Sequence, residues 1–173
     1  MSYASDVKKE LTMLEVHPEH AKAELAALIR LNGELATVND TVFVTIQTEN
    51  ASIARRIFSL IKELFEVRSE ISVRRRMKLK KNNVYFIRLN QQSKRILMEL
   101  DIYESMFYEL NLPESIIKNE QKVRSYLRGA FLARGSVNSP ETNSYHLEIH
   151  STNKVSNEDN FKMMEMFDLN PKT

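Results

Sequence analysis

The 173-residue sequence contains no cysteine. Disulfide bonds, thiolate metal sites and cysteine nucleophiles are therefore excluded. No apolar run approaches the roughly 20 residues that a membrane-spanning helix needs. The N-terminal segment MSYASDVKKELTMLEV carries lysines and glutamates where a signal peptide would carry its apolar stretch. The lack of a long apolar run and of a signal peptide predicts a cytoplasmic protein without membrane contact.

Glycine is also scarce, with only Gly33, Gly129 and Gly135 in the chain. A chain with so few glycines places them where a backbone conformation or a close packing contact requires one. Gly33 follows an Ala- and Leu-rich helical pattern, and we expect it to end that helix in the left-handed conformation.

Acidic residues are missing from one long segment of the chain. Between Ile71 and Leu97 there are nine Lys or Arg residues and no Asp or Glu. Because the whole chain carries +2 and this segment +9, the remainder carries −7. This segregation predicts one positive surface on an acidic body.

Hydrophobic periodicity predicts a mixed helix and strand order in the first part of the chain. Asn39-Asp40 supplies a turn, and Asn50 is placed to cap a helix that ends near Phe65. The expected elements are helices over 5–14 and 19–31, a hairpin around the turn, the capped helix, strands over 71–79 and 84–89, and a helix over 93–100.

The second part of the chain repeats the first. Helices are expected over 126–133 and 161–167, with a strand over 145–149. An offset of 103 residues places Asn50 on Asn153 and Phe58 on Phe161. A repeat of about 100 residues implies pseudo-two-fold symmetry.

This pattern divides the chain into an N-terminal helix (1–18), a first repeat (19–101), an irregular linker broken by Pro113 (102–121) and a second repeat (122–173). The second repeat stops before its second hairpin, and a two-stranded sheet is marginal by itself. We therefore expect either a fragment of a longer protein or a chain that completes its sheet elsewhere.

Two nine-residue segments, LAALIRLNG ending at Gly33 and LRGAFLARG ending at Gly135, resemble the LAGLIDADG motif. Their small residues allow two helix backbones to approach closely, which compensates for the roughly 1 kcal/mol that Gly129 costs in helix propensity. Two unrelated Ala-rich helices are the alternative. The residues expected to pack the helix pair are Ala26, Ala27, Gly33, Gly129, Ala130, Ala133 and Gly135.

In homing endonucleases with this motif, an acidic residue precedes the final glycine and holds a divalent metal. Here Asn32 and Arg134 occupy those positions. Asparagine offers one neutral carbonyl, whereas arginine offers none and repels a cation. Glu34 alone does not make a pair of carboxylates. Because this chain lacks the acidic residues of the motif, we expect no catalytic site, no bound metal and no cofactor.

Segments along nearly the whole chain resemble the WhiA family of bacterial regulators. The resemblance implies an α+β protein with a duplicated αββαββα LAGLIDADG homing-endonuclease-like fold whose second repeat is truncated, and a role in sporulation, cell division or chromosome segregation. No helix-turn-helix, which the family carries after this domain, is found in this sequence. The segments are KKEL (8–11), AEL (23–25), QTEN (47–50), ARR (54–56), KKNN (80–83), YLRGAFL (126–132) and YHLEI (145–149).

Six cations fall within the eight residues 74–81. Strand alternation places Ile71 and Val73 on one face and Arg74 on the other. The same alternation puts Val84, Phe86 and Arg88 of the partner strand on the basic face. Because the LAGLIDADG sheet is a saddle for duplex DNA, the resemblance directs this face to phosphates. The alternative is a solvated edge hairpin whose lysines prevent aggregation. The predicted DNA-binding residues are Arg74, Arg76, Lys78, Lys80, Lys81 and Arg88.

The leading hypothesis is a non-catalytic, nucleoid-associated domain that binds double-stranded DNA and has protein partners in division or sporulation control. An active homing endonuclease is one alternative, and a protein-interaction scaffold that no longer binds DNA is the other. His17 and His20 flank Pro18 in a predicted loop, and we expect no metal there.

Overall fold

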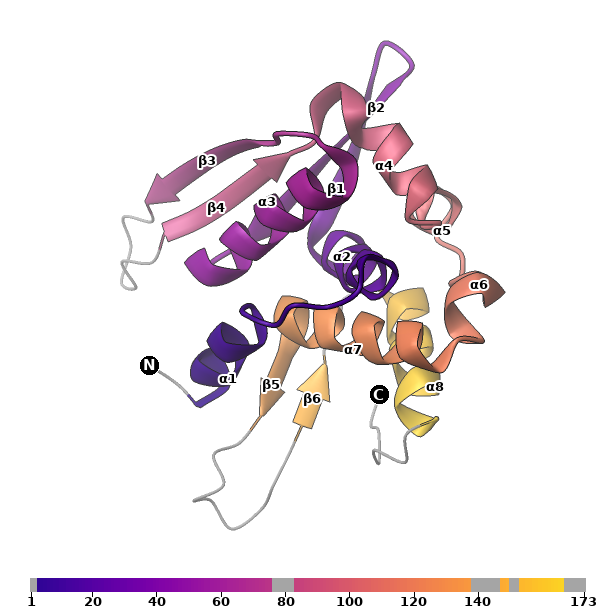
Figure 1. Ribbon diagram of the computed structural model, residues 1–173. Helices are drawn as coiled ribbons and strands as arrows, with labels where there is room; N and C mark the ends of the chain where they lie inside the picture. The colour runs from indigo at the N-terminus through magenta and orange to yellow at the C-terminus, as the bar shows by residue number, and fades with distance from the viewer. Residues whose placement is uncertain (1–2, 76–82, 138–146, 150–152, 167–173) are drawn as a thin grey trace.

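The computed structural model describes residues 3–75, 83–137, 147–149 and 153–166 (Figure 1). Helices alternate with antiparallel hairpins, as an α+β fold requires. The elements are α1 (Tyr3–Leu11), α2 (Pro18–Asn32), β1 (Gly33–Val38), β2 (Thr41–Thr48), α3 (Ala51–Phe65), β3 (Glu70–Arg75), β4 (Asn83–Arg88), the 3-10 turn η1 (Asn90–Gln92), α4 (Ser93–Glu99), α5 (Tyr103–Phe107), α6 (Glu114–Ile117), α7 (Glu120–Arg134), β5 (Gly135–Val137), β6 (Leu147–Ile149) and α8 (Lys154–Glu165).

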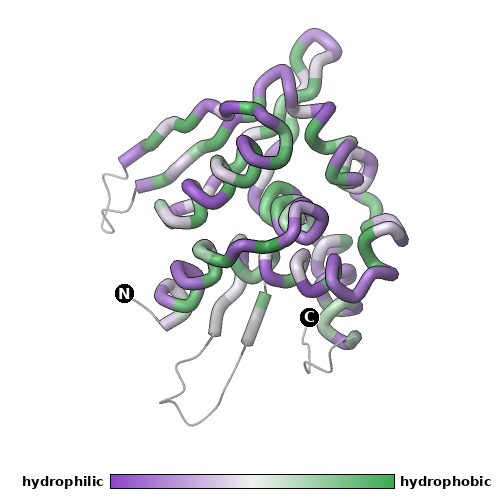
Figure 2. The backbone as a smooth tube through the Cα atoms, in the orientation of Figure 1, coloured by the Kyte–Doolittle hydropathy of each residue, from purple (hydrophilic) through white to green (hydrophobic). Residues whose placement is uncertain are grey.

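Helices α2 and α7 pack against each other at the centre of the molecule, with one sheet on each side of the pair (Figure 1). Each helix runs directly into a strand that begins with glycine, β1 at Gly33 and β5 at Gly135. The predicted duplication is therefore visible in the chain's architecture. Leu25, Leu28 and Ile29 of α2 are fully buried, and Figure 2 shows this helix as a largely hydrophobic coil.

The first sheet is antiparallel with strand order β1-β2-β4-β3. Ile46 of β2 lies opposite Ile87 of β4, and both are fully buried under the helices. Neighbouring positions point to the other face, which we call the open face because Thr45 and Arg88 are half-buried there and Arg74 is exposed. On that open face, Arg88 lies opposite both Thr45 and Glu70. The sheet thus has one core face and one surface face.

Two asparagines at equivalent positions of the repeat begin helices. The Asn50 side chain accepts hydrogen bonds from the backbone N–H groups of Ser52 and Ile53 at the start of α3. The Asn153 side chain accepts one from Ser156 at the start of α8. Both satisfy donors that a helix N-terminus leaves free. The 103-residue offset therefore pairs residues with the same local role.

The predicted turn at Asn39-Asp40 is confirmed. Both residues adopt the left-handed conformation, with φ of 50° and 62°. Two successive left-handed residues match the twist of a two-residue hairpin turn, and short polar side chains tolerate them best.

The expected left-handed conformation of Gly33 is wrong. Its φ of −92° and ψ of 144° are extended, because the chain passes straight from α2 into β1. Position 33 requires glycine because the neighbouring atoms leave no room for a side chain. A Cβ atom would lie 2.3 Å from the Ile29 carbonyl oxygen and 3.2 Å from Cγ2 of Val44.

Other boundaries also differ from the sequence-based expectation, and α8 begins at Lys154 rather than at residue 161. The first helix covers 3–11 rather than 5–14, and Leu14 is exposed beyond it. The segment expected to be irregular contains α5 and α6, and α7 begins at Glu120, with Asn119 as its cap. Helices of five and four residues are too short to show a 3.6-residue period. No helix within the described residues is long and apolar enough to cross a membrane.

Candidate nucleic-acid interface and the base of the helix pair

Gly129 lies where the backbones of α2 and α7 approach each other closely. A Cβ atom at this position would lie 2.2 Å from the Glu24 carbonyl oxygen and 2.9 Å from the Ala27 Cβ. Ala26, Ala27 and Ala130 are fully buried in the same contact region. Small side chains thus allow the two backbones to touch, and any larger residue at 129 would separate them.

The two positions that are acidic in the endonucleases lie at the C-terminal ends of this pair. Asn32 donates from Nδ2 to the carbonyl of Ala133 at 3.4 Å, and Arg134 donates from Nη2 to the carbonyl of Leu31 at 3.4 Å. The last carbonyls of a helix have no intrahelical donor and carry partial negative charge. Two donor side chains therefore satisfy acceptors where two carboxylates would repel them.

A hollow adjoins this base and is lined by α1, the start of β1, the end of β2, the start of α3, and the ends of α2 and α7. Its charged residues are Lys8, Glu34, Glu49 and Arg134. Burial lowers the pKa of the Lys8 ammonium, which also lies 5.5 Å from the centre of the Phe131 ring. Nowhere among the described residues do three His, Asp or Glu side chains converge. The polar lining is mixed in sign rather than a cluster of carboxylates.

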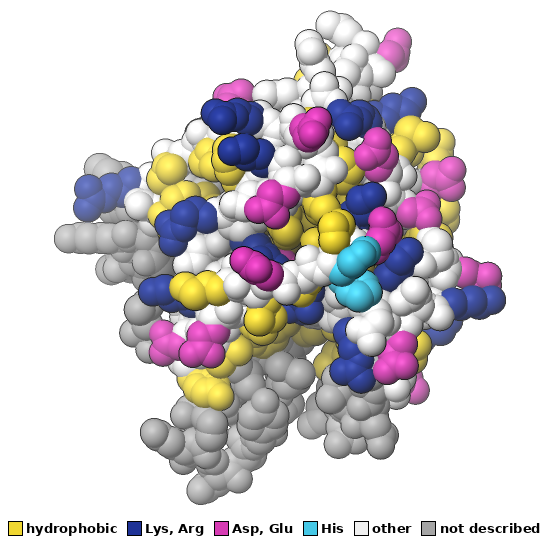
Figure 3. Space-filling view, in the orientation of Figure 1, with side chains coloured by type: hydrophobic (Ala, Val, Ile, Leu, Met, Phe, Trp, Pro, Cys, Tyr) yellow, Lys and Arg dark blue, Asp and Glu magenta, His cyan; other side chains and the backbone are white. Residues whose placement is uncertain are grey.

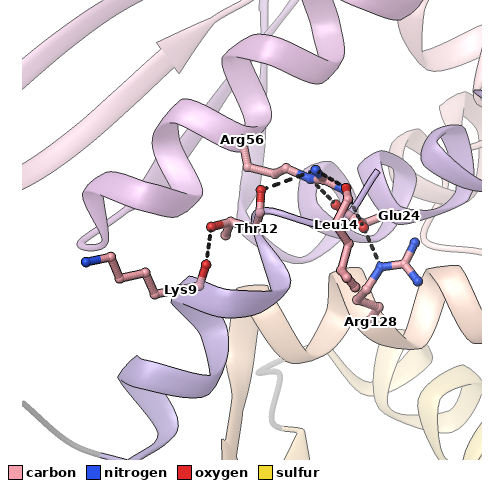
Figure 4. Close-up of polar contacts among 6 residues, drawn as sticks. All are labelled: Lys9, Thr12, Leu14, Glu24, Arg56 and Arg128. Atoms are coloured by element: carbon pink, nitrogen blue, oxygen red, sulfur yellow. Dashed lines mark hydrogen bonds and ion pairs between the residues drawn. The ribbon is translucent and has the colours of Figure 1, made fainter. Parts of the chain in front are cut away.

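A buried carboxylate joins α2 to two neighbouring helices (Figure 4). Glu24 is fully buried and accepts from Arg56 of α3 at 2.8 Å and from Arg128 of α7 at 2.5 Å. Arg56 also donates to the carbonyls of Thr12 and Leu14, in the segment after α1. One buried charge with several donors therefore fixes four parts of the chain.

A second buried ion pair connects α2 to α8. Arg30 lies 2.7 Å from Asp159, and both side chains are almost completely buried. Arg30 also donates to the Tyr126 hydroxyl at 3.1 Å and to the Leu110 carbonyl at 3.0 Å. Asp159 accepts from the backbone N–H of Leu112 at 3.1 Å. This network positions the segment between the repeats.

Tyr126, the uncharged residue of this network, loses its proton less readily than an exposed tyrosine. Burial raises the pKa of the Tyr126 hydroxyl, and Arg30 opposes that rise only in part. Burial alone would lower the pKa of Arg30, but Tyr126 and Asp159 together raise it. Arg30 therefore stays charged and Tyr126 stays neutral inside the protein.

The open face of the four-stranded sheet carries the described part of the basic hairpin. Arg74 is exposed, and its guanidinium lies 5.3 Å from the centre of the Phe86 ring. Arg88 lies 5.8 Å from the same ring and donates to the Ser72 hydroxyl at 2.7 Å. The two guanidinium groups thus flank one aromatic ring on the surface face. Figure 3 shows Lys and Arg side chains beside the grey tip of this hairpin.

The remaining predicted DNA-binding residues, Arg76, Lys78, Lys80 and Lys81, are outside the described residues. The register agrees with the predicted alternation, since Arg74 lies opposite Val84. Val84 is nevertheless buried rather than exposed, so the basic face is narrower than its strand pattern indicates.

Several functional contacts were not predicted from the sequence. Ser72 orients Arg88, but an isolated serine in a strand gives no signal of that role. The ring of His17 caps α2 by accepting from the backbone N–H of Glu19 at 3.2 Å. Its neighbour His20 lies on the helix that follows, with the two ring centres 5.6 Å apart.

Comparison with known families agrees with this arrangement of paired helices and hairpins. Residues 18–103 match the model of the WhiA N-terminal LAGLIDADG-like domain, and residues 123–173 match the model of the WhiA LAGLIDADG-like domain. The protein named "Probable cell division protein WhiA" of Enterococcus faecalis is 57% identical over 173 residues, which are 100% of this chain and 56% of that protein. The protein of the same name from Latilactobacillus sakei is 56% identical, covering 99% of this chain and 55% of its own length. The chain therefore spans just over half the length of these relatives.

Solved structures share the fold at lower sequence identity. A crystal structure of the N-terminal LAGLIDADG domain of DUF199/WhiA has a TM-score of 0.67 at 19% identity, covering 96% of this chain and 74% of that one. A crystal structure of full-length DUF199/WhiA from Thermatoga maritima has a TM-score of 0.69 at 21% identity, covering 96% of this chain and 51% of that one. A variant of I-DmoI in complex with its target DNA, in the presence of magnesium, has a TM-score of 0.54 at 14% identity, covering 87% and 79%. By its family matches and its close relatives, the chain belongs to the WhiA family and carries the family's LAGLIDADG-like fold.

Proposed function

We propose that this chain binds duplex DNA without cleaving it, as part of a WhiA regulator that acts in cell division, sporulation or chromosome segregation. The observation that carries the proposal is the pair of guanidinium groups, Arg74 and Arg88, on the open face of the four-stranded sheet. No Asp or Glu of the described residues forms an ion pair with either of them.

Geometry supports a role for these cations in binding rather than in folding. Arg88 is oriented by Ser72 and by the Phe86 ring, so little side-chain entropy remains to be lost on binding. A planar guanidinium suits phosphate oxygens because it donates two parallel hydrogen bonds. The other basic residues predicted from the sequence follow β3 directly along the chain.

The chemistry at the base of the helix pair supports the proposal that the chain does not cleave DNA. Hydrolysis of a phosphodiester by a LAGLIDADG enzyme needs oxygen ligands for a hard divalent cation. Asn32 and Arg134 are donors to backbone carbonyls there. The positive charge of Arg134 also repels a cation.

Binding to duplex DNA over a salt series tests the proposal. If about five phosphates are neutralised, the logarithm of the association constant falls with the logarithm of salt concentration at a slope of about −4 to −5. We expect plasmid DNA that is incubated with the chain and Mg²⁺ to remain uncut. Specific cleavage would replace the proposal with an active endonuclease, and undetectable or salt-independent binding would replace it with a protein-interaction scaffold.

A further inference from the structure

The segment between the repeats carries an unusual surface. Residues 96–117 contain five acidic residues and no Lys or Arg. Four large apolar side chains in the same stretch are exposed, from 42% for Phe107 to 64% for Tyr108. We call this surface the acidic aromatic patch. It consists of Met98, Asp101, Tyr103, Glu104, Phe107, Tyr108, Glu109 and Leu110.

The aromatic side chains of the patch contact one another, with Tyr103 packed against the core and Phe107 and Tyr108 exposed. Tyr103 and Phe107 stack with ring centres 5.6 Å apart, and Tyr108 meets Phe107 edge to face at 5.0 Å. A hollow beside them is lined by Met98, Tyr103, Glu104 and Leu110, among others. Figure 3 shows acidic and apolar side chains, with Lys and Arg side chains beside them, at the edge of the molecule over α4 and α5. Clustered exposed aromatic and methionine side chains are typical of protein interfaces.

The position of the patch is fixed by the buried core beneath it. Ile102 and Leu112 are buried on either side, and the Leu110 carbonyl accepts a hydrogen bond from the buried Arg30. The backbone N–H of Leu110 donates to the Ser105 carbonyl at 2.9 Å. The apolar groups are therefore presented in one conformation, which lowers the entropy lost when a partner binds.

The charges of the patch are mainly negative and indicate its partner, although the Lys94 ammonium lies 5.6 Å from the centre of the Tyr103 ring. Glu99 pairs with Arg95, and Glu114 pairs with Lys118, at its two ends. No Lys or Arg of the described residues pairs with Glu104 or Glu109. We propose that the patch is a docking surface for a segment of another protein in which apolar side chains are flanked by Lys and Arg.

The negative charges of the acidic aromatic patch disfavour other binding partners. A second copy joined through a two-fold axis would place acidic residues against acidic residues. Phosphates of nucleic acids and anionic lipid headgroups are repelled by this surface. The patch and the β3–β4 hairpin lie at opposite sides of the molecule in Figure 1, so a partner can bind while the sheet holds DNA.

Selection from a displayed library of random peptides against the purified chain tests this inference. Enriched peptides are expected to combine apolar residues with a net positive charge. Their affinity falls about tenfold or more with Tyr108→Ala, or with Glu104→Lys combined with Glu109→Lys. Val38→Ala and Glu63→Lys are the matched controls, because both residues are exposed on other elements. Both controls keep full affinity.

Three outcomes would overturn the inference. The first is a selection that enriches no peptide dependent on the patch. The second is enrichment of neutral or acidic peptides. The third is a dimer in solution that Tyr108→Ala dissociates, which would make a second copy the occupant. Duplex-DNA binding, measured on the same variants, stays unchanged in every case, so this result is separable from the DNA-binding proposal.

Discussion

Asn32 and Arg134 each donate a hydrogen bond to a carbonyl at the end of the other's helix. Asn32 reaches Ala133 and Arg134 reaches Leu31, both at 3.4 Å. The relationship is reciprocal, as the duplicated fold requires. It converts a position suited to a metal-binding carboxylate pair into a polar clasp between α2 and α7.

Restoring two carboxylates at these positions should weaken the fold and create a response to metal. Asn32→Asp combined with Arg134→Asp removes both donors and places negative charge at two helix C-termini. We expect the unfolding free energy to fall by about 2 kcal/mol without divalent metal. Mg²⁺ should restore part of it, because a carboxylate pair binds the ion in the folded state only. Urea denaturation with and without Mg²⁺ measures this, and wild-type stability should not depend on Mg²⁺. A double variant as stable as the wild type would show that these two side-chain hydrogen bonds do not stabilise the helix pair.

The sign of one substitution tests the close helix contact. On helix propensity alone, Gly129→Ala would stabilise the chain by roughly 1 kcal/mol. The new Cβ would instead lie 2.2 Å from the Glu24 carbonyl oxygen, so we expect a loss of about 1–3 kcal/mol. Thermal denaturation distinguishes a stabilising effect of Gly129→Ala from a destabilising one. Ser59→Ala, on the exposed side of α3, is the control. A raised melting temperature for Gly129→Ala would mean that the helices are farther apart.

The buried pair of Arg30 and Asp159 should behave as a coupled unit. Asp159→Asn leaves Arg30 buried without its counter-ion, and we expect a loss of about 3–5 kcal/mol. Arg30→Met combined with Asp159→Leu removes both charges and should be less damaging than the single change. Denaturant unfolding of Arg30→Met, Asp159→Leu and the double variant, each compared with the wild type, gives the coupling energy. Additive effects would contradict the direct contact.

Alkaline pH should reveal Tyr126 among the six tyrosines of the chain. Because burial raises the pKa of Tyr126 above its ordinary 10.0, one tyrosine should ionise only after the others. The unfolded chain loses this proton more readily, so stability is unaffected below pH 10 and falls as the pH rises beyond it. Ultraviolet absorbance titration follows the ionisation, and Tyr126→Phe should remove the late component. A late component that persists in Tyr126→Phe would assign it to another residue.

Local signals in the sequence predicted much of the fold. Asn50 and Asn153 were aligned by the repeat, and both cap helices. The Asn39-Asp40 turn follows from the tolerance of these residues for positive φ. The strand alternation around Arg74 follows from a two-residue period. Each of these depends on neighbours along the chain.

Contacts between distant segments could not be predicted in the same way. Arg30 and Asp159 pair across the two repeats, and neither residue carries a local pattern that indicates its partner. The short helices α5 and α6 form because Ile102, Leu112 and Ile116 are buried, not because of helical periodicity. Gly33 lies at the expected end of its helix, but its conformation depends on β1 beginning at once.

The most direct test of the central claim is the salt dependence of duplex-DNA binding by Arg74→Gln combined with Arg88→Gln. If both guanidinium groups contact phosphates, the slope of the logarithm of affinity against the logarithm of salt becomes shallower by about 2 relative to the wild type. Arg55→Gln, on α3 beyond the covered face of the sheet, should leave the slope unchanged. An equal slope for the wild type and the double variant would contradict DNA binding by the open face of the sheet.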